Sequence, residues 1–303
     1  MIKIIKGLFL SMVLFSLLTA CSNQEYRITN VRIYRDTPIW GLAQAVNRQD
    51  TRRIAQIAEE MPELLDYQDP LYGTTLLFWA VGMEKYESTR ALLEAGADPD
   101  IISIYEGGTA LYRAAKFSFI DNDFKKDARF VRLLLEYGAD PNLGFVGNAR
   151  NNITEIGTTP LMASIGCGID KTRALIEYGA DINFQTESGQ TAAMIALRHG
   201  GSAASMLGRL EYAHYLIVVH QADITRPRIA QPLHGEAFYS YPVASLRDWI
   251  FPLDSDRHLL KMEIVREFAR QGVDYWATEI HRHQLEQIQR RYPDTWEEYI
   301  ELY

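Results

Sequence analysis

The side chains that could catalyse a reaction or bind a metal are scattered along this 303-residue sequence. Two metal ligands on a helix must share a face, but His281 and His283 lie two residues apart and would point to different faces. Asp121 and Asp123 are spaced like calcium ligands, yet their stretch lacks the glycine and the distal glutamate of a calcium loop. We therefore expect neither a metal ion nor a cofactor.

Covalent catalysis would require Cys167, one of only two cysteines, to lie beside a base. The surrounding sequence supplies no base, so we expect Cys167 to be a buried, apolar side chain. A hydrolytic site near the C-terminus remains an alternative. It would need convergence in one pocket of His234, His258 and either Asp254 or Asp256. Because no motif joins these residues, the sequence predicts no catalytic residue and no enzyme.

The elements that position all these side chains are internal repeats, built from two phrases that recur in a fixed order. The first phrase opens with glycine and threonine and continues as a helical pattern, at residues 73–81, 107–115, 157–165 and 189–197, with a degenerate copy at 37–46. The second phrase is a leucine-rich helix ending in Gly-Ala-Asp, at residues 92–100, 134–142 and 175–183, with weaker copies at 216–224 and 265–275. Threonine caps a helix start, and glycine provides the left-handed residue that ends a helix. Each unit is therefore predicted as helix, turn, helix and protruding loop.

These phrases resemble the ankyrin-repeat family. The resemblance implies an all-α solenoid of helix-turn-helix units with protruding hairpin loops, in which each unit covers the apolar face of its neighbour. The repeats are expected over residues 37–224, with a weak first unit at 37–70 and clear units over about 73–224. Residues 225–303 are expected to hold an irregular, proline-containing connector, a divergent repeat at about 242–275 and a helical C-terminal cap. Core positions are expected at Leu77, Trp79, Leu111 and Leu161.

Three segments depart from the regular repeat, at residues 117–129, 143–156 and 199–212. Long loops in a compact scaffold are usually functional or disordered. Two interpretations of the Asn- and Gly-rich insertion at 143–156 therefore remain: a binding loop, or an insertion without a function.

The N-terminus predicts export. Residues 1–20 combine two lysines with an apolar run too short to cross a bilayer, as in a secretory signal peptide. The run ends in Leu-Thr-Ala-Cys, which resembles the lipobox of bacterial lipoproteins and implies that Cys21 carries acyl chains such as palmitate. Ser22 then implies, in a Gram-negative host, an outer-membrane anchor facing the periplasm; in a Gram-positive host the anchor would lie on the outer face of the plasma membrane. Residues 21–36 are expected to form a polar tether, and an ordinary cleaved signal is the alternative.

The acidic composition narrows the class of partner. Lys and Arg number 31 against 39 Asp and Glu, a net charge of −8. Such a surface repels nucleic acid, does not favour anionic membranes, and would attract a basic protein partner.

Ankyrin-repeat domains bind proteins through finger tips and the exposed side of the first helices, so the resemblance implies a partner-binding set. Placing the repeats in register selects Tyr72, Thr74, Met83, Tyr105, Glu106, Lys116, Phe117, Phe145, Glu155, Thr158, Glu187, Gln190, Arg198 and His199. An anchored repeat protein resembles immunity proteins that neutralise secreted antibacterial effectors, such as a periplasm-acting lipase. The alternative is an envelope scaffold or stress-protection protein with no toxin partner.

Overall fold

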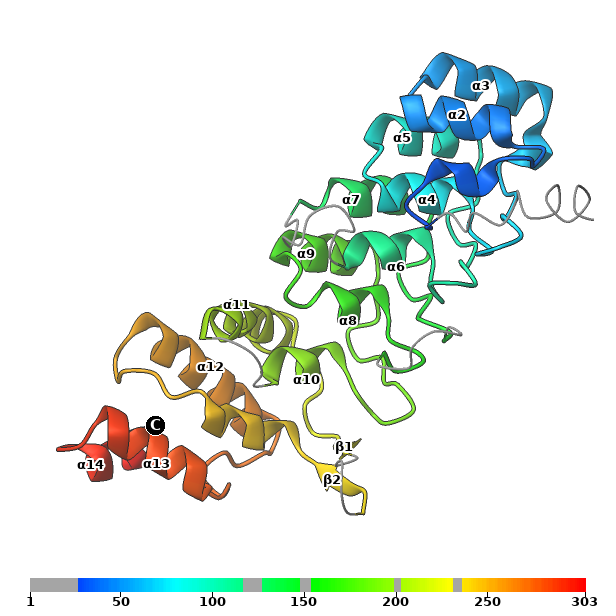
Figure 1. The fold of residues 1–303 in the computed structure, drawn as a ribbon. Helices are drawn as coiled ribbons and strands as arrows, with labels where there is room; N and C mark the ends of the chain where they lie inside the picture. Colours follow the sequence, from blue (N-terminus) through cyan, green and yellow to red (C-terminus); the bar gives the residue numbers. More distant parts are fainter. Residues whose placement is uncertain (1–26, 117–126, 148–153, 199–202, 231–235) are drawn as a thin grey trace, which may run out of the picture.

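The computed structural model describes residues 27–116, 127–147, 154–198, 203–230 and 236–303. Paired helices stack in two layers, and the connecting loops project along one edge (Figure 1). The first helix of each unit belongs to one layer: α2 (Trp40–Arg48), α4 (Leu76–Gly82), α6 (Ala110–Ala115), α8 (Pro160–Ser164) and α10 (Ala192–Leu197). The second helices form the other layer: α3 (Thr51–Glu60), α5 (Tyr86–Glu94), α7 (Arg129–Glu136), α9 (Ile169–Glu177) and α11 (Ala203–His214). The predicted all-α ankyrin solenoid is confirmed.

The helix boundaries follow the two sequence phrases. The hydroxyl oxygen of Thr75 accepts the main-chain N–H of Phe78 at the start of α4, and threonine caps the starts of α6, α8 and α10 in the same way. The glycines of the second phrase have positive φ, as at Gly96 (97°) and Gly138 (88°), which a residue with a Cβ rarely adopts. The predicted core residues Leu77, Leu111 and Leu161, with Trp79, are all buried. None of the helices in the described ranges is long and apolar enough to cross a bilayer.

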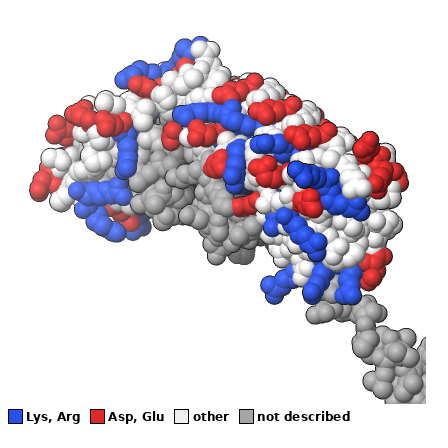
Figure 2. All heavy atoms as spheres, turned by 90° about the horizontal axis from the view of Figure 1, so that it is seen from above, with Lys and Arg blue, Asp and Glu red and all other residues white. Residues whose placement is uncertain are grey.

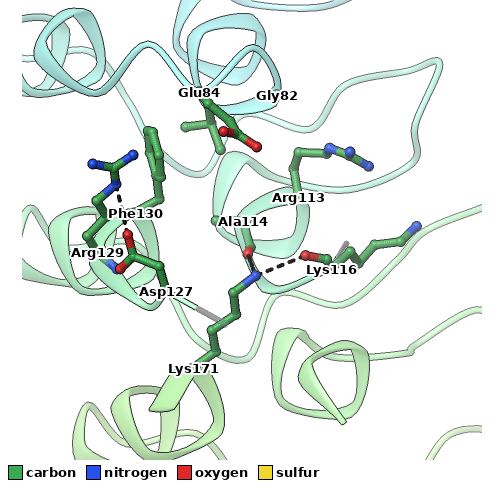
Figure 3. A pocket seen from close by; sticks show the side chains of 10 residues that line it. Gly82, Glu84, Arg113, Ala114, Lys116, Asp127, Arg129, Phe130 and Lys171 are labelled. Carbon is green, nitrogen blue, oxygen red and sulfur yellow. Dashed lines mark hydrogen bonds and ion pairs between the residues drawn. The ribbon is translucent and has the colours of Figure 1, made fainter. Parts of the chain in front are cut away.

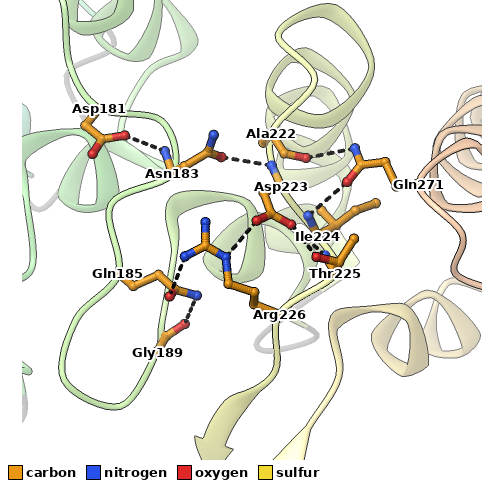
Figure 4. Close-up of polar contacts among 10 residues, drawn as sticks. All are labelled: Asp181, Asn183, Gln185, Gly189, Ala222, Asp223, Ile224, Thr225, Arg226 and Gln271. Carbon is orange, nitrogen blue, oxygen red and sulfur yellow. Dashed lines mark hydrogen bonds and ion pairs between the residues drawn. The ribbon is translucent and has the colours of Figure 1, made fainter.

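A ladder of side-chain oxygens sets the spacing between adjacent units. The amide oxygen of Asn183 accepts the N–H of Asp223 at 2.8 Å (Figure 4), and Asn142 accepts the N–H of Asp181 at 2.7 Å. Each aspartate also accepts an N–H two residues further on; Asp181, for example, accepts that of Asn183. The Gly-Ala-Asp aspartates are therefore turn formers, as predicted.

The fifth unit contains the weak copy at 216–224. Its second helix, α11, continues as the π-helical segment η3 (Tyr215–Val219), so part of the insertion at 199–212 lengthens this helix. After η3 the chain resumes the finger geometry, because Asp223 occupies the same position in the ladder as Asp181. Residues 199–202 lie outside the described residues, as do 117–126 and 148–153 of the other two insertions.

The C-terminal part contains the expected divergent unit. The 3₁₀ segment η4 (Pro242–Asp248) takes the place of a first helix, and α12 (Asp256–Arg270) packs on α11 as a second helix. Gln271 joins this unit to the fifth one, since its amide accepts the N–H of Ile224 and donates to the carbonyl of Ala222 (Figure 4). α13 (Arg282–Arg291) and α14 (Trp296–Leu302) complete the cap.

The prediction of an irregular connector over residues 225–242 is incomplete. Arg228–Ala230 (β1) and Phe238–Ser240 (β2) pair as antiparallel strands, with Ile229 opposite Tyr239. The strands were missed because each has three residues, too few for an alternating pattern to stand out in the sequence. This hairpin lies at the same edge as the other loops (Figure 1).

The prediction of a polar tether over residues 21–36 is wrong for its last part. Residues 31–34 form the 3₁₀ segment η1 (Val31–Tyr34), and Ile33 and Tyr34 are buried against the first unit. The hydroxyl of Tyr34 lies 2.9 Å from the carbonyl oxygen of Thr75, at the start of α4. Burial of this aromatic ring holds the segment in place.

Candidate protein-binding surface

The fingers are the loops that join one helix pair to the next, and main-chain hydrogen bonds link them to one another. Val146 N donates to Gly107 O at 2.8 Å, and Ile229 N in β1 donates to Ser188 O at 2.7 Å. Gly107 has a φ of 70°, and a Cβ there would lie 2.4 Å from the carbonyl oxygen of Gly147. Only glycine therefore permits this close approach between fingers. The fingers together form one continuous edge of the molecule.

Large apolar side chains are exposed along this edge. Leu71, Ile104, Val146 and Ile156 are 55%, 69%, 52% and 63% exposed on three successive fingers. The β1–β2 hairpin and the residue next to it add Phe238, Tyr239 and Tyr241, all more than half exposed. We call these seven residues the finger row. Exposed apolar residues gathered along one edge are typical of interaction sites in soluble proteins.

Three residues of the predicted binding set are buried, so their assignment as partner contacts is wrong. Thr74 (0% exposed) hydrogen-bonds to the Ser103 hydroxyl at 2.9 Å. Phe145 (3%) stacks on the ring of Tyr112, and Thr158 (8%) donates to the carbonyl oxygen of Glu155. These side chains hold the fingers in shape instead of meeting a partner.

Two aromatic residues of the predicted set lie half-buried on adjacent fingers. Tyr72 and Tyr105 meet edge to face, with ring centroids 4.8 Å apart. Tyr105 N also donates to Tyr72 O at 3.0 Å. Together they connect the first two fingers and present only part of their surface.

The polar members of the predicted set are divided between fingers and helix ends. Glu155 accepts the N–H and the hydroxyl of Ser188, each at 2.8 Å, and so connects two fingers. Gln190 accepts from the exposed Arg198 at 3.3 Å. Glu106 is half-buried and Glu187 is exposed.

The remaining members lie away from the finger tips or outside the described residues. Met83 and Lys116 are half-buried beyond the C-terminal ends of α4 and α6. Met83 shares a small apolar pocket with Ile28. Phe117 and His199 lie outside the described residues.

The predicted finger residues miss the exposed row by one position. The predicted binding set contains Tyr105, but its neighbour Ile104 is more exposed. It also contains Glu155, but its neighbour Ile156 is more exposed. Successive side chains of an extended segment point to opposite sides, so a shift of one residue exchanges the outward set for the inward set. The signal that could have found the row was an aliphatic residue at a loop position in consecutive fingers.

A pocket lies away from the fingers, where the two helices of a unit are joined. This small, partly open pocket has a volume of about 40 Å³ and is bordered by the ends of α4 and α6 and the starts of α7 and α9 (Figure 3). The ammonium group of Lys171 donates to the carbonyl oxygens of Ala114 and Lys116, at 2.8 and 3.0 Å. Arg129 forms an ion pair with Asp127 at 3.0 Å.

Burial lowers the pKa of three basic residues that line this pocket. It lowers the pKa of Arg113 to about 10, and it also lowers those of Lys116 and Lys171, each further reduced by the charge of Arg113. An arginine with a pKa of about 10 is still charged at neutral pH. The pocket therefore presents positive charge, whereas the finger row is apolar.

The described residues do not assemble the alternative hydrolytic site. Nδ1 of His258 accepts the main-chain N–H of Asp254 at 3.3 Å, so this ring belongs to the N-terminal turn of α12. His234 lies outside the described residues, and within them no cluster of three His, Cys, Asp or Glu side chains could hold a metal. Cys167 is buried as predicted, and burial raises the pKa of its thiol. A protonated thiol is a poor nucleophile.

Comparison with known proteins agrees with the architecture. Two family models of ankyrin repeats match the chain, one over residues 65–121 and the other over 123–228. Protein PhlB of Serratia liquefaciens is 37% identical over 160 residues, which cover 52% of this chain and 61% of PhlB. The E3 ubiquitin-protein ligase KEG of Arabidopsis thaliana is 29% identical over 198 residues, 63% of this chain and 11% of that protein. The chain thus spans less than two thirds of either relative. With the phrases, the stacked helix pairs and the inter-unit ladder all in agreement, the chain belongs to the ankyrin-repeat family.

Proposed function

We propose that this chain is a membrane-anchored, non-enzymatic ankyrin-repeat lipoprotein that binds and neutralises a secreted antibacterial effector, such as a periplasm-acting lipase. Ankyrin repeats form a protein–protein interaction module, which makes a protein partner the natural ligand. The observation that carries the proposal is the finger row, because exposed aliphatic and aromatic residues on a rigid edge are the usual anchors of a protein interface.

The proposed anchor rests on the N-terminal sequence. An apolar run ending in Leu-Thr-Ala-Cys supports lipidation of Cys21, and Ser22 supports an outer-membrane location facing the periplasm in a Gram-negative host. More than one acyl chain on Cys21 would give stable anchoring. An inhibitor held there would stand beside the bilayer that such an effector attacks.

The binding experiment captures partners from the producing bacterium with residues 22–303 and identifies them by mass spectrometry. We expect one stoichiometric partner with the sequence of a secreted toxin. Ile104→Asp with Ile156→Asp should weaken its binding at least about tenfold, because each change places a charge in an apolar contact. Surface exposure of both side chains should leave the melting temperature unchanged.

Val219→Asp is the matched control, since Val219 is 55% exposed at the end of η3 and is not in a finger. It should bind the partner as the unmodified chain does. Capture of envelope proteins alone would favour the scaffold function over immunity. Equal loss of binding in the control and the finger variant would remove the finger row as the interface.

Anchoring is tested separately by feeding the producing bacterium labelled palmitate. Cys21→Ala should lose the label and leave the membrane fraction, whereas Cys167→Ala should keep both. Label that persists in Cys21→Ala would contradict the anchor without affecting the binding proposal.

A further inference from the structure

Positive charge is concentrated at the N-terminal end of the solenoid. Residues 27–55 contain six arginines and only two acidic residues, although the whole chain has a net charge of −8. All six arginines are exposed. We call them the arginine patch: Arg27, Arg32, Arg35, Arg48, Arg52 and Arg53.

Three arginines of the patch have no acidic side chain beside them in the part of the chain that the structure describes. Several arginines further along the chain do form ion pairs, such as Arg132 with Glu177 at 2.7 Å and Arg226 with Asp223 at 2.7 Å. Within the described residues, no carboxylate lies at ion-pair distance from Arg27, Arg48 or Arg52. An exposed arginine without an acidic neighbour remains available to an external anion.

The position of the patch relates it to the anchor. On the face seen in Figure 2, Lys and Arg side chains gather at the end where the described chain begins, whereas acidic and basic groups alternate along the repeats. Cys21 precedes Arg27 by six residues, and six residues span at most about 20 Å. The buried Tyr34 ties this segment to the start of α4. A lipid on Cys21 would therefore hold the patch close to the membrane surface.

We propose that the arginine patch docks on anionic phospholipid headgroups and orients the solenoid with its first unit against the membrane. This inference rests on the anchored location proposed above. A guanidinium group binds a phosphate through two parallel hydrogen bonds. Attraction to an anionic surface extends only about a Debye length, so the patch contributes once the anchor has brought it there.

The opposite charge of the remaining chain reinforces this orientation. An anionic bilayer attracts the first unit and repels the acidic units behind it, which turns the patch toward the lipid. The expectation from net charge, that anionic membranes are not favoured, holds for the average surface and fails for this end. A membrane fits the observations better than a nucleic acid does, because the patch adjoins the predicted lipidation site.

The experiment measures co-flotation of unlipidated residues 22–303, which retain every described residue, with lipid vesicles. We expect binding to vesicles of phosphatidylethanolamine and phosphatidylglycerol, weak binding to phosphatidylcholine vesicles, and release at high salt. The triple variant Arg48→Glu, Arg52→Glu and Arg53→Glu should bind the anionic vesicles at least about tenfold more weakly. Arg52 and Arg53 start α3, where a negative side chain favours the helix, so these changes should not unfold it.

The matched control reverses three exposed arginines of the cap: Arg257→Glu, Arg266→Glu and Arg290→Glu. It has the same net charge as the patch variant and should bind anionic vesicles as the unmodified chain does. Equal binding to neutral and anionic vesicles, or equal loss in both triple variants, would overturn the proposal. So would tighter binding to duplex DNA with the same arginine dependence. Because no partner protein and no lipid anchor is present, these outcomes are independent of effector capture and of palmitate labelling.

Discussion

The repeat body and the C-terminal cap bury polar groups in different ways. In the body, each unit repeats one device: an asparagine or aspartate oxygen that accepts a main-chain N–H of the next unit. In the cap, two buried basic side chains lie in an aromatic cluster, and burial lowers the pKa of one of them, Lys261, well below its ordinary value. Nζ of Lys261 lies 4.0 Å from the ring centroid of Tyr303, and the guanidinium group of Arg247 lies 4.0 Å from that of Tyr275.

The repeat body has many equivalent polar interactions, whereas the cap depends on a few. Loss of one rung in the body leaves the neighbouring rungs and the leucine core intact, since a solenoid is held by nearest-neighbour contacts. Arg247 has no such substitute, because its side chain donates to the carbonyl oxygens of Tyr303 and Tyr275 and to the hydroxyl of Thr278. Aligned repeats thus distribute their polar interactions, whereas the cap concentrates them.

The largest effect should come from raising the pH. Burial raises the pKa of Tyr303 to about 12 and also raises those of Tyr275 and Tyr299 above the ordinary 10.0. When a tyrosine has a higher pKa in the folded state than in the unfolded state, it adds fully to the free energy of unfolding below pH 10. That contribution is lost as the pH rises from 10 toward 12, because ionisation then favours the unfolded state. Burial also raises the pKa of Tyr34, Tyr112 and Tyr212 in the body, but these three phenols lie in separate parts of the solenoid. In the cap, Tyr303 stacks on Tyr299 and accepts a hydrogen bond from Tyr275. We expect the cap to unfold before the body, as followed by tyrosinate absorbance and circular dichroism.

Two phenylalanine variants sharpen this alkaline prediction. Tyr299→Phe removes one buried ionisation and should move the cap transition to higher pH. Tyr239→Phe alters an exposed ring and should leave the transition in place. An unchanged transition in Tyr299→Phe would show that buried phenols do not drive it.

The second effect is the loss of Arg247. Arg247→Ala removes three hydrogen bonds made by a buried guanidinium group and should lower the free energy of unfolding by about 3–5 kcal/mol, because hydrogen bonds to charged groups are the stronger ones. Urea unfolding measures this, with the exposed Arg257→Ala as a control expected to change it by less than about 0.5 kcal/mol. A small loss in Arg247→Ala would mean that the cap does not depend on one cation.

The third test asks whether the body also contains a single residue on which several hydrogen bonds depend. The buried carboxylate of Asp69 accepts the N–H groups of Leu71, Tyr72 and Thr74 in the first finger. Asp69→Ala should cost about 2–3 kcal/mol, since hydrogen bonds to a charged group are the strong ones. Asp69→Asn keeps one acceptor oxygen and should cost less. A loss larger than that of Arg247→Ala would reverse the comparison between body and cap.

The smallest effect should be the removal of one rung of the ladder. Asn142→Ala leaves the N–H of Asp181 without its acceptor and should cost about 1 kcal/mol in urea unfolding. Asn183→Ala removes the next rung and should cost a similar amount. Unequal costs for the two variants would show that the rungs are not equivalent.

Much of the repeat body could be predicted from the sequence, because its interactions are periodic. Threonine caps, positive-φ glycines and buried leucines recur at fixed offsets, so each copy supports the interpretation of the others. The binding set was harder to predict, because it depends on which side of an extended finger each residue faces. Thr74, Phe145 and Thr158 were placed on the wrong side by this ambiguity.

The sequence alone determined the fold class, the succession of helix pairs, the turn role of the Gly-Ala-Asp phrase and the burial of Leu77, Leu111 and Leu161. Local propensity and repetition decide these features, and both are visible along the chain. Only the tertiary structure decided that Tyr34 fixes the N-terminal segment, that the finger row faces outward, and that Arg247 and Lys261 are buried in the cap. Each of these depends on contacts between residues that are distant in sequence. Such contacts occur only once, so they leave no repeated pattern in the sequence from which they could be predicted.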